Sequence, residues 1–343
     1  MSKQYIKSWV DTNAGKVPVI TGELDFQDKL GALRVRLSIL RMSYMVSPGL
    51  YAIGNPNRES TVFVSANFKL SFDMLRRELK DIDTWILVLD TKGINVWCAA
   101  GKGMFGTQEL VTRIKATDLE KIVNHRKLIV PQLGATGISA HEVKKLSGFS
   151  VIFGPVRVMD IPAFLNAGLK ATQEMRRVNF TFYDRFVLIP VEIVGGVKYL
   201  LFITALFYLL SGLNRNGYSD SITLNYGSRS IINLLFVYIG GTVAGPLLLP
   251  WLHGRSFAMK GFSAGLVFFV ILYFLKLTGR SVMEIISWVL IIPAVSSFIL
   301  LNFTGASTYT SISGVRKEMR IAIPLQAAAV VAGLVIWIIS RFV

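Results

Sequence analysis

The sequence contains one cysteine, Cys98, and three histidines in 343 residues. A single thiol excludes an internal disulfide. It also excludes an internal iron–sulfur cluster, which takes about four thiolates, and a structural zinc site of the cysteine-rich kind. Electrons from an iron–sulfur cluster would therefore have to come from another protein.

Charged side chains are scarce in the second half of the chain. Residues 1–185 hold 26 of the 37 Lys and Arg and 17 of the 21 Asp and Glu. We therefore predict two parts, one facing water and one apolar. The net charge of +16 is interpreted as basic residues beside anionic lipid. Since no zinc finger, RNP-like motif or basic helix is present, we expect no nucleic-acid partner.

The apolar second part, residues 186–343, is predicted to be an all-α membrane domain. A membrane helix needs about 20 mostly apolar residues, and five stretches qualify, at about 187–211, 231–252, 257–277, 282–303 and 320–340. Glu284 lies near the end of one span and His253 lies in a loop. Because no row of ionisable residues follows the spans, an anchor or a passive partner surface is favoured over a transporter, which stays open.

The start of the chain, MSKQYIKSWVDTNAGK, lacks the apolar region of a secretory signal. Eight basic residues flank the predicted spans on the side of the first part, against five on the other side. This weak positive-inside bias agrees with the missing signal. We therefore expect a multi-pass protein of the cytoplasmic membrane whose first part faces the cytoplasm.

Residues 61–185 are predicted to form an α/β domain, preceded by a lead-in lobe at residues 1–60. Apolar runs such as TVFVSA, TWILVLD, INVWCAA, KLIVPQ and FSVIFGPV alternate with helix-like segments such as SFDMLRRELKDI. This alternation is typical of a mainly parallel, Rossmann-like sheet. Such sheets bind ligands beyond the carboxyl ends of their strands. Four segments are predicted to lie there, at 65–67, 95–101, 132–134 and 154–156.

Gly101, Gly103 and Gly106 have the spacing of the dinucleotide-binding fingerprint. That fingerprint needs an acidic residue at the end of the next strand, about 20 positions later. The next strand, KLIVPQ, ends in Gln132 and Leu133 instead. We therefore predict no nicotinamide or flavin dinucleotide at this loop.

Three interpretations of Cys98 are open from the residues alone. Cysteine is often a small buried apolar residue. As a nucleophile it usually needs a histidine base, and the first part offers His125 and His141. As an axial ligand to the metal of a large cofactor it needs no base. The small residues after it and the nearby Lys102, which could stabilise a thiolate, argue against a purely structural thiol.

The octapeptide NVWCAAGK, residues 95–102, resembles the signature of the HgcA family, the membrane-bound corrinoid proteins of microbial mercury methylation. Further segments resemble the corrinoid domain of that family in order: YAIGNPN, SANFKLSFDMLRREL, PQLGATGISAHEVKK, GFSVIFGPVR and IPAFLNAG. The resemblance covers about residues 45–340, including the apolar tail. The domain is also similar to the corrinoid domain of the corrinoid iron–sulfur protein, which lacks the cysteine.

This resemblance implies a base-off, cobalamin-type corrinoid, with Cys98 as its lower axial cobalt ligand and as the catalytic residue. The implied contacts come from the signature helix and from three strand ends. They are Asn95, Val96, Trp97, Ala99, Ala100, Gly101 and Lys102, the side chains of Ser65, Asn67 and Ser71, and the loops Leu133-Gly134-Ala135 and Pro155-Val156-Arg157.

The implied activity is a corrinoid-dependent methyltransferase that converts Hg(II) to methylmercury. The implied partners are a ferredoxin of the HgcB type with two 4Fe–4S clusters as reductant, a methyltetrahydrofolate-linked methyl donor, the Hg(II) substrate and membrane lipid. A second hypothesis remains open, in which the chain is a membrane-anchored corrinoid methyl carrier of one-carbon metabolism and mercury is an incidental acceptor.

Overall fold

The computed structural model describes residues 5–305 and 312–343. The chain divides into two compact units, Met1–Val178 and Asn179–Val343, which are described separately. The predicted boundary at residue 185 lies inside the second unit. Phe180 explains this position, because its ring packs with Leu249, Phe257 and Phe303 of the second unit.

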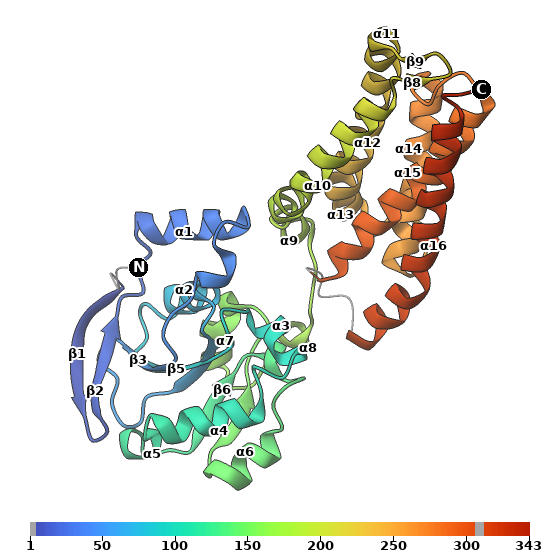
Figure 1. Ribbon diagram of the computed structural model, residues 1–343. Helices are drawn as coiled ribbons and strands as arrows, with labels where there is room; N and C mark the ends of the chain where they lie inside the picture. Colours follow the sequence, from blue (N-terminus) through green and yellow to red (C-terminus); the bar gives the residue numbers. More distant parts are fainter. Residues whose placement is uncertain (1–4, 306–311) are drawn as a thin grey trace. The chain divides into compact units, whose positions relative to one another are not determined.

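A mixed sheet of seven strands forms the centre of the first unit, in the order β1-β2-β3-β5-β4-β6-β7 (Figure 1). Strands β5, β4, β6 and β7 are parallel, β3 is antiparallel to β5, and β2 and β1 extend the sheet beyond β3. The strands are β1 (Ile6–Thr12), β2 (Gly15–Ile20), β3 (Gly49–Ile53), β4 (Val62–Ala66), β5 (Thr84–Leu89), β6 (Lys127–Val130) and β7 (Ser150–Phe153).

Helices cover both faces of this sheet, so β4 and β5 are buried along their whole length. On one face, Phe63 and Ile86 pack with Phe72 of α2. On the other face, Val64 and Leu87 pack with Leu110 of α4. The helices are α1 (Phe26–Arg36), α2 (Lys69–Glu78), α3 (Val96–Gly101), α4 (Thr107–Ala116), α5 (Leu119–Ile122), α6 (Ala140–Ser147), α7 (Ile161–Asn166) and α8 (Gln173–Arg176).

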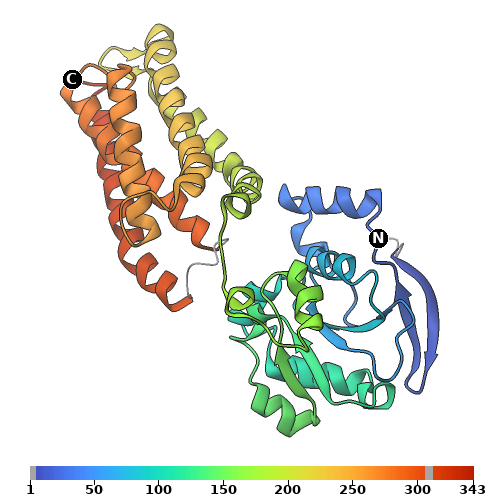
Figure 2. The same ribbon diagram turned by 180° about the vertical axis from the view of Figure 1, so that it is seen from behind.

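The predicted α/β class is confirmed, and the structure adds two features to it. Residues 1–60, expected to be a lead-in lobe, contribute three strands to the same sheet and the helix α1. Figures 1 and 2 show α1 lying outside α2, on the side away from the sheet. The run INVWCAA, grouped with the strand-like segments, forms the short helix α3 after β5.

The second unit contains the five predicted apolar spans as helices long and apolar enough to cross a membrane. These segments are Phe182–Leu210, Asp220–Leu248, Phe257–Phe274, Val282–Asn302 and Ser313–Ile339. They contain α9 (Phe182–Phe186), α10 (Ile189–Leu210), α11 (Asp220–Ile222), α12 (Ser228–Ile239), α13 (Gly245–Leu248), α14 (Phe257–Phe274), α15 (Val282–Asn302) and α16 (Ile312–Ile339), and a hairpin of β8 (Leu213–Asn214) and β9 (Gly217–Tyr218) follows α10.

Glycines allow α14 and α15 to approach closely. A Cβ on Gly261 would lie 2.7 Å from the Ser297 Cα, and one on Gly265 would lie 2.5 Å from the Pro293 Cα. These two glycines are four residues apart, so they lie on one face of α14. Small residues at this spacing are typical of helix contacts in lipid.

Candidate functional site

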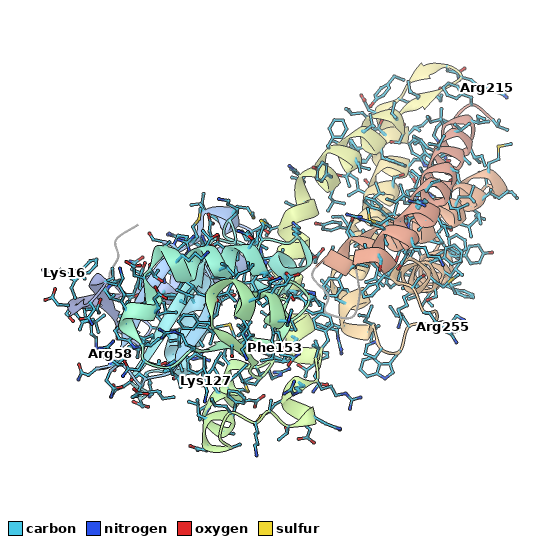
Figure 3. All side chains as sticks on the ribbon, turned by 90° about the horizontal axis from the view of Figure 1, so that it is seen from below. Lys16, Arg58, Lys127, Phe153, Arg215 and Arg255 are labelled. Carbon is cyan, nitrogen blue, oxygen red and sulfur yellow. The ribbon has the colours of Figure 1, made fainter. Side chains whose placement is uncertain are left out.

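The carboxyl ends of the parallel strands form one edge of the sheet. Ala66 at the end of β4 pairs with Leu89 at the end of β5, and Val130 of β6 pairs with Phe153 of β7. Lys127 and Phe153, labelled in Figure 3, mark the amino and carboxyl edges on β6 and β7. The four segments predicted at strand ends therefore follow neighbouring strands at the carboxyl edge.

Cys98 lies at this edge, in the middle of helix α3. The helix begins because the Asn95 side chain accepts a hydrogen bond from the Cys98 N–H at 2.9 Å, which is an N-cap. Ala99 and Ala100 are buried in the core against the sheet. Cys98 is half-buried, and Gly101 and Lys102, three and four residues later, are exposed. Helical spacing therefore places these three residues on the outward face of α3.

The thiol has no hydrogen-bond partner among the residues that the structure describes. Gly101 lies on the next turn of the same face, is exposed and adds no side chain there. Val96 and Trp97 are half-buried at the start of the helix. The Cys98 residue is therefore partly exposed, on the side of α3 that faces away from the core.

Asn67 holds the loop that leads from β5 to α3. Its Oδ1 accepts hydrogen bonds from the N–H of Thr91 at 3.1 Å and of Gly93 at 3.0 Å. Its Nδ2 donates to Asp90 Oδ1 and to the Met45 sulfur. Asn67 is 1% exposed, so its amide is occupied within the protein. It positions the cysteine loop, and a direct bond to a ligand would require breaking these contacts.

The other two predicted side-chain donors differ in accessibility. Ser65 is buried within β4, and its hydroxyl donates to the neighbouring Ala66 carbonyl at 3.2 Å. Ser71 is half-buried in the first turn of α2. Of the three, Ser71 alone combines some exposure with a position near the carboxyl edge.

The loop after β6 packs directly against α3. A Cβ on Gly137 would lie 3.1 Å from the Ala100 Cα, and one on Gly134 would lie 2.5 Å from the Phe105 ring. Leu133 and Ala135 are half-buried beside them. Gln132, which was not among the predicted contacts, has a buried Oε1 without a hydrogen-bond partner in the described part of the chain. Its position at a strand end was the signal available in the sequence.

The segment after β7 offers fewer free backbone groups than predicted. Pro155 is buried and has no N–H to donate. The N–H of Val156 donates to the Met175 carbonyl at 2.8 Å. Arg157, at the N-cap of a 3₁₀ turn at Val158–Asp160, is half-buried.

The glycines that imitate a dinucleotide fingerprint form the turn between α3 and α4. Gly103 has φ +79°, a conformation that favours glycine, and Gly106 is the N-cap of α4. The fingerprint requires a strand followed by a helix. Here the glycines connect two helices, which supports the prediction that this loop is not a nicotinamide or flavin dinucleotide site.

Among the described residues, neither His125 nor His141 shares a hydrogen bond with the Cys98 thiol. His125 Nε2 lies 2.8 Å from the Ser60 carbonyl, and the Nδ1 accepts from the Lys127 N–H. These partners precede β4 and begin β6, so His125 lies at the amino edge of the sheet. His141 is exposed on the first turn of α6. A cysteine–histidine nucleophile is therefore not supported.

Residues 24–165 match the protein family described as CO dehydrogenase/acetyl-CoA synthase delta subunit, CdhD. The gamma subunit of the acetyl-CoA decarbonylase/synthase complex from Methanopyrus kandleri is 36% identical over 122 residues, covering 35% of this chain and 26% of that protein. The corrinoid/iron-sulfur protein large subunit from Moorella thermoacetica is 32% identical over 126 residues, covering 36% of this chain and 28% of that protein.

These matches confirm the predicted relationship to the corrinoid iron–sulfur protein. The matched part covers the sheet from β3 to β7 and includes α3 with Cys98. The chain spans about a quarter of the length of the curated relatives it matches. The five apolar helices of the second unit lie outside residues 24–165, the part that matches the family.

Proposed function

We propose that the first unit binds a corrinoid at the carboxyl edge of its sheet, with the Cys98 thiolate as lower axial ligand to cobalt. We further propose that the protein is a methyltransferase that passes a methyl group to Hg(II). The observation that carries the proposal is a lone, half-buried cysteine on the outward face of α3, within residues 24–165 that match the CdhD family.

The residues around Cys98 fit a flat, ring-shaped cofactor. The sulfur lies on a helix face whose next turn is Gly101, and the loop beyond it has open space at Gly103. Groups of three or more His, Cys, Asp and Glu that could hold a metal are absent from the described residues. A metal at this thiol would therefore have to bring its other donors, as a corrinoid does.

The chain contributes orientation and electron donation. Asn67 and the Asn95 cap fix α3, while Ala99 and Ala100 anchor its inner face, so the sulfur is held in one direction. A thiolate is a strong donor that pushes electron density through a metal to the opposite ligand. When bound, the corrinoid would supply a cobalt-held methyl group that can leave with its electron pair to Hg(II), forming methylmercury.

The chain has no iron–sulfur ligands of its own beyond Cys98. Restoring the cofactor after each transfer requires two electrons and a new methyl cation. We propose that an HgcB-type ferredoxin with two 4Fe–4S clusters supplies the electrons, and that a methyltetrahydrofolate-linked donor supplies the methyl group.

The similarity to acetyl-CoA decarbonylase/synthase subunits favours a second candidate. In it, the protein is a membrane-anchored corrinoid methyl carrier of one-carbon metabolism, and mercury is an incidental acceptor. Both candidates share Cys98 and the corrinoid, and they differ in the methyl acceptor.

We also propose that the five apolar helices span the cytoplasmic membrane and that the first unit faces the cytoplasm. The excess of basic residues on one side of the spans supports this orientation. Labelling of cysteines introduced at Arg176 and Arg215, in a Cys98→Ala background, tests it. Modification of both positions by an impermeant reagent from the outside would contradict the orientation.

The visible spectrum of the purified full chain, reconstituted with a corrinoid, tests the central claim. We expect a sulfur-ligated cobalt spectrum for the wild type, loss of that signature in Cys98→Ala, and a nitrogen-ligated signature in Cys98→His. Methyl transfer to Hg(II) should fall by about 100-fold or more in Cys98→Ala, because the axial donor is lost. Unchanged cobalt spectra in Cys98→Ala would refute the ligation.

Single-turnover assays with methylated corrinoid separate the two candidates. Transfer to Hg(II) that is faster than transfer to a physiological thiol acceptor supports the mercury methyltransferase. The reverse order supports the carrier.

A further inference from the structure

Four side chains of residues 39–45 form an apolar surface that is exposed in the described part of the chain. The side chains of Ile39, Leu40, Met42 and Met45 are 48%, 65%, 58% and 46% exposed. This segment, here called the 39–45 segment, connects α1 to β3 and contains a 3₁₀ turn at Arg41–Ser43. Four large apolar side chains so close together on a water-facing unit indicate a surface that something covers.

The backbone of this segment is strained at and next to the exposed residue Leu40. Leu40 has φ +51° and Ser38 has φ +58°, a left-handed conformation that is rare for residues other than glycine and asparagine. Such conformations concentrate at sites that bind ligands, because the surrounding structure must maintain them. Ser43 closes the turn at Leu40, since its N–H and its hydroxyl donate to the Leu40 carbonyl at 3.1 and 3.0 Å.

The segment touches the loop that positions Cys98. A Cβ on Gly93 would lie 2.7 Å from the Met42 carbonyl oxygen and 3.7 Å from the Met45 Cβ. Met45 also bridges to Phe68, immediately after β4, and its sulfur accepts from Asn67. Gly93 lies three residues before the start of α3. The 39–45 segment and α3 therefore lie at the same edge of the sheet and share the loop Thr91–Gly93.

A cavity of about 280 Å³ lies beside this segment and is lined in part by Ile39, Leu40, Gln27 and Arg34. Its wall also carries the charged side chains Asp25, Asp28 and Lys69, and Asp28 and Lys69 are bound to each other in an ion pair. A corrinoid has the matching chemistry, with an apolar ring and a rim of uncharged amide side chains that both donate and accept.

We propose that the 39–45 segment is a second wall of the corrinoid site, with Leu40 and Met42 as positioning residues that contact the bound cofactor. This inference rests on the proposed corrinoid binding and adds contacts that the sequence signature around Cys98 does not contain. Its role is affinity and placement, whereas cobalt ligation depends on Cys98.

The test is a titration of the full chain with cobinamide, a corrinoid without a lower base, in the double variant Leu40→Asn, Met42→Gln. Asparagine tolerates the left-handed conformation at position 40, so the change removes the apolar side chain and keeps the backbone. We expect binding about tenfold weaker, because two apolar contacts are lost, with an unchanged sulfur-ligated cobalt spectrum at saturation.

The matched control is Leu146→Asn, Met74→Gln, at two exposed apolar residues of α6 and α2. We expect its affinity to stay within about twofold of the wild type, since no contact with the cofactor is removed. Equal affinities of test and control variants would overturn the inference. Failure of the wild type to bind cobinamide would overturn the proposed function instead.

Hydrogen exchange of the wild type gives an independent readout that needs no variant. Backbone amides of residues 39–45 should exchange more slowly when cobinamide is bound. Protection that appears on transfer from detergent to anionic lipid vesicles, and does not change with cobinamide, would identify lipid as the occupant and contradict the proposal.

Discussion

The first unit buries charged side chains against one another, whereas the second unit buries hydroxyls and amides mainly against backbone carbonyls. In the first unit, Asp28 and Asp73 share ion pairs with Lys69 and Arg76 between α1 and α2. In the second unit, the hydroxyls of Thr204, Ser230 and Thr242 each donate to the carbonyl four residues earlier. The ion pair of Glu284 with Arg341 is an exception.

Solvent explains this difference. A water-facing unit can bury a charge when an opposite charge and hydrogen bonds compensate it. A helix surrounded by hydrocarbon must satisfy its polar groups internally, and a hydroxyl bonded to its own helix does so. The surface of the second unit is consistent with this explanation, because its large apolar side chains Phe202, Trp251 and Phe274 are 70–76% exposed. Four predictions test this contrast, in order of decreasing effect.

Replacement of Asp28 should have the largest effect. Asp28→Ala leaves Lys69 and Arg76 buried with one carboxylate between them, which should cost about 3–5 kcal/mol of stability. Hydrogen exchange of the full chain should accelerate in β4 and β5 and stay unchanged in α15. The control Asp81→Ala removes an exposed, loose pair with Lys80 and should change little. Equal acceleration in α15 would show that the units do not unfold independently.

Asn67→Ala should destabilise the cysteine loop by about 3 kcal/mol, because the N–H groups of Thr91 and Gly93 lose their acceptor in a buried site. Amides 91–98 should exchange faster, and the Cys98 thiol should react faster with a thiol reagent. Ser65→Ala, which removes a bond to the adjacent carbonyl alone, should cost less than about 1 kcal/mol. If the exchange of amides 91–98 is unchanged in Asn67→Ala, Asn67 does not hold the loop and is again a candidate contact of the ligand.

Gly265→Leu should destabilise the second unit by about 2 kcal/mol, since the new side chain meets the backbone of α15 at Pro293. Gly195→Leu on α10 is the matched control, because a Cβ there meets nothing within 4 Å. Thermal unfolding in detergent micelles measures both variants. A similar loss in both would mean that glycine flexibility matters more than the α14–α15 contact.

Asp90 should show the smallest effect. The hydrogen bond from Lys92 lowers the pKa of Asp90 below its ordinary value of 3.8. The resulting stabilisation is present above the unfolded pKa and is lost as the pH falls through the lower, folded pKa. Asp90→Asn should therefore cost less than about 1 kcal/mol at pH 7, and the stability difference from wild type should shrink as the pH falls below 3.8 and vanish below the lower, folded pKa. If the stability difference between wild type and Asp90→Asn grew as the pH fell, the lowered pKa of Asp90 would be contradicted.

Local patterns predicted much of the fold. The run TWILVLD is continuously apolar, and β5 is buried along its whole length between two helical layers. The five apolar stretches form five long helices. The second helix begins at Asp220, before its predicted start, because a π-helical turn at Thr223–Gly227 continues it into more polar residues. Both signals depend on near neighbours in the chain.

Residues 1–60 show the limit of such patterns. β2 and β3 pair with distant residues, as Val19 does with Ala52 and Leu50 with Leu87, whereas β1 pairs with β2 in a local hairpin that the short-range pattern did not reveal. Partners more than 30 positions apart leave no short-range periodicity that identifies them. The segment was therefore expected as a lobe, and its three strands and the exposed 39–45 segment were not anticipated.

The sequence by itself determined that one thiol stands alone among small residues, and that the chain has a charged and an apolar half. Both facts follow from composition and local order. Tertiary structure decided which face of α3 carries Cys98, that Asn67 holds the cysteine loop, and that the 39–45 segment lies beside that loop. These relations depend on β3, β5 and β4 being neighbours in one sheet. The pairing of these strands joins residues far apart in the chain, and tertiary packing determines it.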